Sequence, residues 1–157
     1  MNIFYLDKDP VIATKYMYNK HIVKMILESA QMLCTAHHHF GNGDNVPYRK
    51  AHYNHPSTKW VRENTLHYKW LYNHMLALGY QYTKKYNKIH QTIVKCTMPL
   101  INPPLGMPTK EFVQPPQCMP DQYKDKCSIK AYWNYYEQDK KKIATKSEKI
   151  ITRPIFY

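Results

Sequence analysis

Apolar residues recur every three or four positions near the start of the chain and predict a long helix over residues 11–37. The positions that share this face are Ile22, Val23, Ile26, Leu27, Ala30 and Leu33. Pro10 precedes the pattern and suits the beginning of a helix. The apolar run before it, residues 2–6, fits either a short strand or an N-terminal arm.

A second helix is predicted over residues 56–90. Pro56 suits its first position, because the missing N–H of proline would have no intrahelical partner there. Gly79 is expected to bend or break this helix. A third helix is predicted over residues 128–148, and the glycine-containing stretch 38–54 between the first two is expected to be a loop.

Residues 97–120 contain seven prolines, which fix φ and remove backbone donors, so this segment is expected to be neither helix nor central strand. We interpret it as an extended strap laid over the domain. The fold class that follows is mainly α: a compact single domain, residues 1–157, of about three main helices with long irregular, proline-rich connections.

The charge of the chain favours a polyanionic partner. The formal net charge is +12, from 23 Lys and Arg against 11 Asp and Glu. The excess lies in residues 41–95 and 121–157, while residues 1–40 and 96–120 are nearly balanced. A positive field of this size attracts nucleic acid and makes association salt-dependent, although charge that serves only solubility would look the same.

The four cysteines form no CxxC pair, and the first residues, MNIFYLDKDP, lack the apolar run of a signal peptide. No stretch is apolar for long enough to span a membrane. These features favour a cytoplasmic protein with free thiols and no membrane partner.

Five polar residues share one arc of the first predicted helix: His21, Lys24, Glu28, Gln31 and Thr35. Their spacing of three and four residues confines them to an arc of roughly 90°, nearly opposite the main apolar face. An ordinary solvent-exposed face would give the same spacing. A carboxylate beside a cation and an imidazole can also perform acid–base chemistry, and the mixture of side-chain types favours such a site.

A second cluster surrounds the expected start of the second helix and contains Asn54, His55 and Trp60. Free N–H groups at a helix N-terminus can hold a phosphate. The basic residues expected around it are Arg49, Lys50, Lys59 and Arg62. A plain capping motif is the alternative.

No metal or cofactor is expected. The three histidines of the run 37–39 point in different directions on a helix, so they cannot bind one ion together. The chain has no HExxH, GxGxxG, Walker or GxSxG motif. The segment 131–142 mixes aromatic and basic residues, which suits stacking on unpaired bases, although about half of these rings suit a core equally well.

With these residues in view, the chain resembles the small phage-type pyrimidine-dimer DNA glycosylases of the endonuclease V type and their uncharacterised phage relatives. The resemblance is carried by His21 and Glu28, seven residues apart on the first helix, and by the element Asn54-His55-Pro56 ahead of Trp60. The aromatic, basic C-terminus is similar too, with its tail of Arg153, Pro154, Phe156 and Tyr157.

The resemblance implies a mechanism in which an N-terminal amine attacks the sugar C1′ and forms a Schiff base, assisted by Glu28, on a flipped-out nucleotide. The family has a threonine after the initiator methionine, where this chain has Asn2, whose larger side chain discourages removal of Met1. The nucleophile is therefore the Met1 amine or Lys24. Gln31 stands where the family has an arginine that contacts phosphate.

We therefore expect a DNA glycosylase, with or without AP-lyase activity, that acts on a damaged or modified pyrimidine. Its catalytic residues are expected to be Glu28, His21, Lys24 and Met1, and Gln31 is expected among the nucleic-acid-binding residues. Two alternatives remain open: a nucleic-acid- or nucleotide-binding protein without catalysis, and an enzyme that processes nucleotides or nucleosides. A strongly salt-dependent affinity for duplex DNA would count against the last of these.

Overall fold

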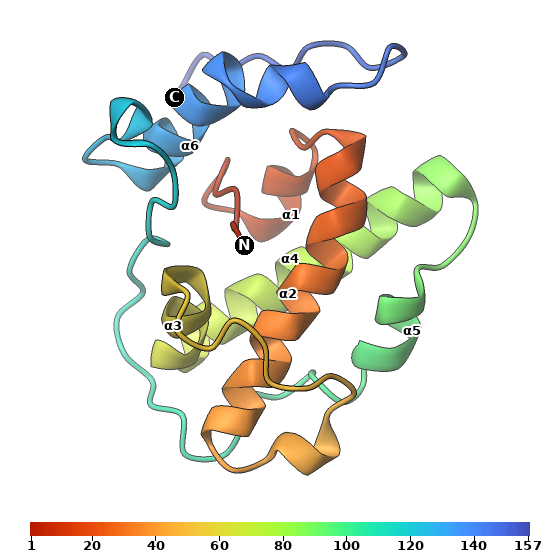
Figure 1. Cartoon of the computed structure of the whole chain (residues 1–157), viewed down its shortest axis with the longest axis vertical. Coiled ribbons are helices and arrows are strands. Elements are labelled where there is room, and N and C mark those ends of the chain that lie inside the picture. The colour runs from red at the N-terminus through yellow and green to blue at the C-terminus, as the bar shows by residue number, and fades with distance from the viewer.

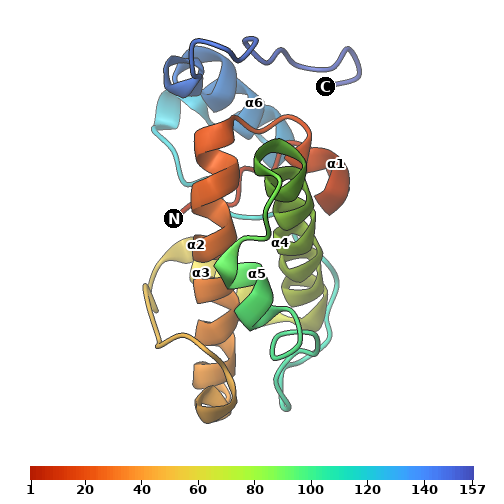
Figure 2. The same cartoon turned by 90° about the vertical axis from the view of Figure 1, so that its right-hand side faces the viewer.

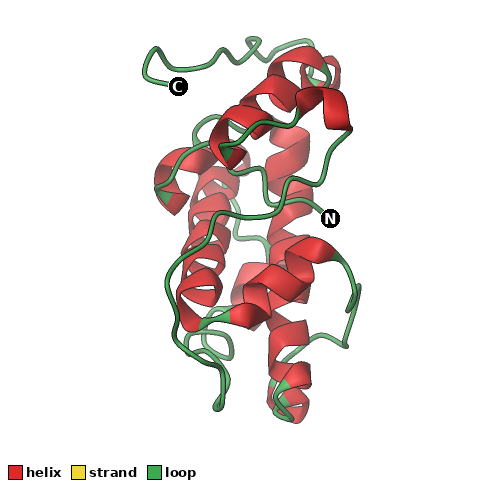
Figure 3. Ribbon diagram, turned by 90° about the vertical axis from the view of Figure 1, so that its left-hand side faces the viewer, coloured by secondary structure: helices red, strands yellow, loops and turns green.

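The computed structural model describes residues 1–157, and its regular structure is entirely helical (Figure 3). The six α-helices are α1 (Pro10–Thr14), α2 (Asn19–His39), α3 (Pro56–Glu63), α4 (Thr65–Tyr86), α5 (Gln91–Cys96) and α6 (Ser128–Gln138). Three single 3₁₀ turns join them: η1 (Gly43–Asn45), η2 (Asp121–Tyr123) and η3 (Lys140–Ile143). The mainly α class expected from the sequence is confirmed.

The two long helices, α2 and α4, pack against each other through the middle of the molecule (Figure 1). Helices α3 and α5 lie on opposite sides of this pair, and α6 lies across the end at which α2 begins (Figures 1 and 2). The apolar side chains of all these parts meet in one core of 29 buried residues. No helix is long and apolar enough to cross a membrane.

The first predicted helix is in fact two, α1 and α2, separated by residues 15–18. Asp9 caps α1 by accepting hydrogen bonds from the N–H groups of Val11 and Ile12. Met17 and Tyr18, which lie in this break, are both buried in the core. The N–H of Asn19, at the start of α2, donates to the carboxylate of Glu148 at 2.6 Å, a favourable charge for a helix N-terminus.

The second predicted helix is also interrupted, but at Asn64 rather than at Gly79. The side-chain oxygen of Asn64 accepts hydrogen bonds from the N–H groups of Leu66 and His67 and so starts α4 anew. Helix α4 continues through Gly79 without a break. A Cβ there would lie 2.7 Å from the side chain of Ile93 on α5, so the glycine makes room for that side chain.

The third predicted helix ends at Gln138, ten residues early, and is followed by η3 and an irregular tail. Residues 2–6 form an arm rather than a strand, and Ile3 to Leu6 of this arm are fully buried. Residues 97–120, which we interpreted as a strap, contain no helix or strand, and much of this segment runs along the side of the molecule that bears α3 (Figures 1 and 3).

Trp133 joins α6 to the buried arm. Its side chain is fully buried, and its indole N–H donates to the carbonyl of Leu6 at 2.9 Å. We expect Trp133→Phe to lower the free energy of unfolding by about 1–3 kcal/mol, because the Leu6 carbonyl loses its donor inside the core. Urea unfolding followed by circular dichroism measures this loss; a change within about 0.5 kcal/mol, as for an ordinary surface substitution, would mean that the bond contributes nothing.

Candidate functional site

The polar stripe of α2 is covered by other parts of the chain and is not a solvent-exposed face. His21 and Thr35 are buried, Glu28 and Gln31 are half-buried, and only Lys24 is exposed. The hydroxyl of Thr35 exchanges hydrogen bonds with the backbone of Ala51, both at 3.0 Å. The other end of the stripe faces the N-terminal arm and α6.

Four predicted catalytic residues line one small pocket of about 110 Å³: Met1, His21, Lys24 and Glu28. The nitrogen of the Met1 amine lies 3.9 Å from Oε1 of Glu28, an ion pair without direct hydrogen-bond contact. The remaining lining residues are Asn2, Phe4, Met25 and Lys140. The pocket thus contains an amine, a carboxylate and an imidazole, flanked by two lysines.

Asn2 holds the beginning of the chain against two distant segments. Its amide NH₂ donates to the carbonyl of Cys118 in the strap at 2.9 Å, and its amide oxygen accepts from the hydroxyl of Tyr132 on α6 at 2.8 Å. The side chain of Met1 is buried, and the Thr58 hydroxyl of α3 lies 3.7 Å from its sulfur. These contacts fix the position of the Met1 amine.

His21 is fixed in a neutral form. Its Nδ1 lies 2.6 Å from the hydroxyl of Tyr136, and that hydroxyl oxygen lies 3.4 Å from the N–H of Tyr18. Burial, with Lys140 and Lys24 nearby, lowers the pKa of His21 to about 3. The ring is therefore neutral, and one of its two nitrogens carries a hydrogen while the other accepts.

The backbone is strained at Phe4, which lines the pocket, and at His52, which does not. Phe4 has a φ of 53° although it is a large side chain, and its ring stacks on His21 with centroids 4.1 Å apart. His52 has a φ of 48° in the loop before α3. Such conformations cost about 1–3 kcal/mol each and concentrate at functional sites, where the surrounding structure maintains them.

His55 begins α3 as its cap, since Nδ1 accepts a hydrogen bond from the N–H of Ser57 at 3.1 Å. Burial lowers the pKa of His55, and the positive Met1 amine and His52 lower it further. The ring is therefore neutral and close to the pocket. The sequence suggests a phosphate site at this helix N-terminus. The capping bond of His55 already occupies one of the N–H groups that would bind the phosphate.

The predicted phosphate-binding residues do not form one cluster. Arg62 donates to the carbonyl of Tyr53 at 2.7 Å and lies 3.9 Å from the centroid of its ring, so it supports the loop before α3. Lys50 lies over the same ring at 4.9 Å. Arg49, Asn54 and Lys59 are exposed, Gln31 is half-buried, and Trp60 is buried with its indole N–H on the carbonyl of Val113.

The three histidines at the end of α2 contact three different partners, as expected from their adjacent positions. His37 lies 2.8 Å from the Tyr68 hydroxyl, His38 bonds the carbonyl of Tyr48, and His39 bonds the Tyr53 hydroxyl. No group of three or more His, Cys, Asp or Glu side chains is placed to hold a metal ion.

The aromatic residues of α6 belong mainly to the core. Tyr132, Trp133 and Tyr136 are all at most 1% exposed. Only Tyr135 is half-buried, with the Lys140 ammonium 4.7 Å from its ring centroid. The stacking surface considered for residues 131–142 is therefore reduced to this one ring.

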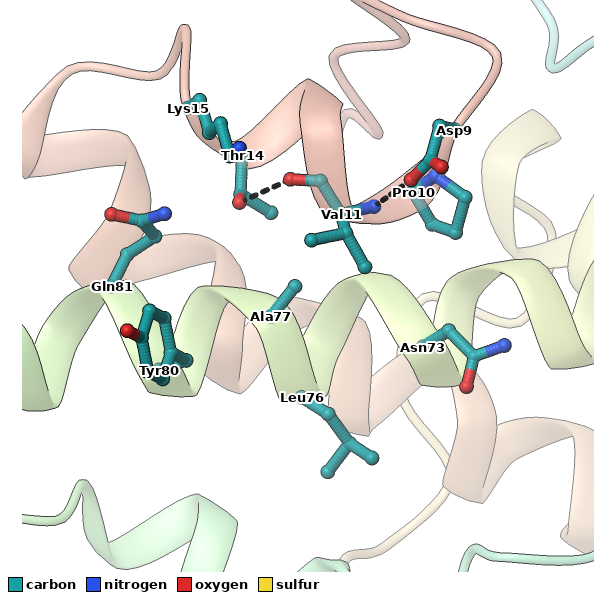
Figure 4. A pocket seen from close by; sticks show the side chains of 10 residues that line it. All are labelled: Asp9, Pro10, Val11, Thr14, Lys15, Asn73, Leu76, Ala77, Tyr80 and Gln81. Atoms are coloured by element: carbon teal, nitrogen blue, oxygen red, sulfur yellow. Dashed lines mark hydrogen bonds between the residues drawn. The ribbon is translucent and has the colours of Figure 1, made fainter.

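The largest cavity, about 480 Å³, lies between α1 and α4 and contains none of the predicted site residues (Figure 4). Two of its polar side chains are engaged locally: Asp9 caps α1, and Thr14 donates to the carbonyl of Val11 at 2.7 Å. The other walls include Leu76, Ala77 and Tyr80 of α4. We assign it no catalytic role, because it brings no acid and base together.

Several residues of the site could not be found from the sequence. Phe4 and Tyr136 come from opposite ends of the chain, and Tyr136 is 115 positions from its partner His21. Lys140 reaches the pocket from η3. The only signal was the aromatic, basic composition of the last helix, which indicated that segment but not these residues.

Comparison of the sequence and the structure with known proteins gives no match to a family model, a curated protein or a solved structure.

Proposed function

We propose that this protein is a DNA glycosylase that removes a damaged or modified pyrimidine and can cleave the resulting abasic site. The observation that carries the proposal is the approach of the Met1 amine to Glu28, 3.9 Å apart in a pocket bordered by a neutral imidazole and two lysines. The resemblance to the phage-type pyrimidine-dimer glycosylases, which rests on His21 and Glu28, supports the same chemistry.

The proposed reaction uses the pocket as follows. The free amine of Met1 forms a bond to C1′, and the bond from C1′ to the base breaks, with its electron pair leaving on the base. Glu28 accepts a proton from the attacking amine and stabilises the positive charge that develops at C1′. The C1′–O4′ bond then breaks, O4′ takes the proton from Glu28, and the nitrogen lone pair completes an imine between Met1 and C1′. Loss of a proton from C2′ then expels the 3′ phosphate by β-elimination, which cleaves the strand.

The pocket suits this chemistry because it combines a nucleophilic amine, a carboxylate that can accept a proton and a neutral imidazole. Neutral His21 borders the pocket without adding a second charge beside Glu28. Lys24 and Lys140 supply positive charge for the phosphates on either side of the attacked sugar.

Sodium borohydride should trap the protein on lesion-bearing duplex DNA, because it reduces the imine to a stable secondary amine. Duplexes with an abasic site, a thymine dimer or a modified pyrimidine are the substrates, and an unmodified duplex is the control. Peptide mapping of the adduct should place the DNA on Met1. An adduct on Lys24 would replace the nucleophile but keep the reaction class.

The intact mass of the purified protein should first establish that Met1 is its first residue. Absence of both an adduct and base release with every duplex would reject the glycosylase. The remaining candidates would then be a nucleotide-binding protein without turnover or a nucleotide-processing enzyme. Unchanged nucleotide released on denaturation would favour the former.

A further inference from the structure

A second pocket, separate from the proposed catalytic one, is bordered by both charged and apolar residues. It measures about 340 Å³ and lies between α3 and the strap, where Lys59, Trp60 and Glu63 face Val113, Gln114 and Pro116. Pro56 also lines it and follows His55, whose pKa responds to the Met1 amine. The carbonyl of Pro116 accepts from the hydroxyl of Tyr132, which also bonds Asn2. The two pockets therefore share their supporting residues.

Glu63 brings an uncompensated carboxylate to this pocket. Its side chain is 58% exposed, and its only partner within ion-pair distance is His67, whose Nδ1 lies 4.0 Å away. That ring is neutral: Nδ1 bonds the carbonyl of Trp60 at 2.8 Å, Nε2 accepts from the N–H of Val113 at 2.9 Å, and burial lowers the pKa of His67. In a chain of net charge +12, Glu63 thus has no lysine or arginine within ion-pair distance.

Lys59 and Gln114 supply the complementary groups. Lys59 is exposed at the pocket and makes no ion pair, although it precedes Glu63 by one helical turn. The amide oxygen of Gln114 accepts from the N–H of Ser128 at 2.7 Å, which directs its NH₂ away from that bond. The only partner of this NH₂ is the sulfur of Cys127 at 3.9 Å, so its hydrogens remain available.

We propose that this pocket binds a nucleobase with an exocyclic amine, cytosine in the first instance, from a nucleotide next to the attacked one. The Glu63 carboxylate accepts from the exocyclic amine, and the Gln114 amide donates to the ring acceptor beside it. Carboxylates recognise the N4 amine of cytosine in this way, whereas the O4 oxygen of thymine would face the carboxylate acceptor to acceptor. Lys59 contacts the phosphate of the same nucleotide.

The apolar walls fit this occupant. Trp60, Val113 and the two prolines supply apolar surface for a flat ring, while Lys59 and Glu63 both lie on α3. The volume of about 340 Å³ accommodates one nucleotide but not a duplex. The inference rests on the proposed function only in placing the nucleotide in DNA, because binding to the pocket can be measured without catalysis.

Nuclear magnetic resonance with single nucleotides tests the pocket directly. The indole N–H of Trp60 is expected to shift on titration with dCMP or dAMP and much less with dTMP. The indole groups of Trp70 and Trp133, which bond the carbonyls of Lys8 and Leu6, serve as internal references and should not move. The dCMP and dAMP titrations distinguish a pyrimidine from a purine with the same exocyclic amine.

Glu63→Gln should weaken dCMP binding about tenfold, equivalent to about 1.4 kcal/mol, and should improve dTMP binding because a glutamine amide can donate to O4. Glu111→Gln changes the same charge on an exposed strap residue and should leave both affinities unchanged. Lys59→Gln should weaken all three nucleotides alike, with exposed Lys110→Gln as its control.

An unmoved Trp60 signal, or equal affinities for dCMP and dTMP that ignore Glu63→Gln, would overturn the inference. Glu28→Gln separates this outcome from failure of the proposed function, because that variant should lose base release and keep dCMP binding. If borohydride trapping fails while the selective shift of Trp60 is present, the base-binding pocket stands without the glycosylase.

Discussion

Glu28→Gln is expected to abolish most base release, with a loss of about 10²–10⁴-fold in rate, the range typical of a positioned acid–base group. Glutamine keeps the size of the side chain but cannot accept a proton from the Met1 amine, which lies 3.9 Å from the carboxylate. It also cannot stabilise positive charge at C1′. A single-turnover assay of base release on the substrate identified by borohydride trapping measures the loss.

The fold of this variant should be intact, because Glu28 is half-buried and its only close charged contact is the amine. Glu111→Gln removes a carboxylate from the exposed surface and should keep wild-type activity. Equal melting temperatures of both variants would confirm that any loss of rate is chemical. A rate within about threefold of wild type would exclude Glu28 from the reaction, since it lies well below the range for such a group.

Tyr136 shows why periodicity predicts the helix that contains Glu28 but not the residues that cover it. The arc that contains His21 and Glu28 follows from residue spacing alone, which describes one helix at a time. Whether that arc meets water or another segment depends on partners far away in sequence. Here the cover comes from Phe4, 17 residues before His21, and from Tyr136, 115 residues after it.

Two helix boundaries differ from the predicted ones. One is set by a local capping residue and the other by a contact with a distant part of the chain. At Asn64, a strong capping residue inside a continuous apolar pattern separates α3 from α4. The sequence contains this capping signal, whereas the predicted bend or break lies at Gly79. At residues 15–18 the reason is external, since Glu148 in the C-terminal tail satisfies the first N–H of α2. No local pattern could have indicated that contact.

The basic residues show that net charge does not reveal where each basic side chain lies. Net charge correctly indicates a positive surface, but it does not tell a free ammonium from one engaged in the fold. Arg62 supports Tyr53 through a hydrogen bond and its ring face, whereas Lys24 and Lys140 border the pocket. Lys140 was expected only as part of an aromatic, basic segment, and its role at the site depends on the turn that follows α6.

Acid is expected to destabilise the fold well above the pH at which carboxylates titrate. Burial lowers the pKa of His21 to about 3 and the pKa values of His37 and His74 to about 4. In the unfolded chain these imidazoles titrate near 6.5. Below pH 6.5 the unfolded state therefore binds more protons than the folded state. The contribution of the neutral imidazoles to stability is fully present above this pH and is lost as the pH falls toward 4.

The expected size follows from proton linkage: each such imidazole removes about 1.4 kcal/mol per pH unit, or about 2 kcal/mol between pH 7 and pH 5. Three of them together remove about 6 kcal/mol, comparable with the whole stability of many domains. Urea unfolding at the two pH values measures the difference. His74→Gln, at a fully buried ring whose Nε2 has no hydrogen-bond partner, should reduce the difference by about one third of that sum. His39→Gln, at an exposed side chain, should leave it unchanged, and equal stabilities of the wild type at pH 7 and pH 5 would show that these rings are protonated in the folded protein.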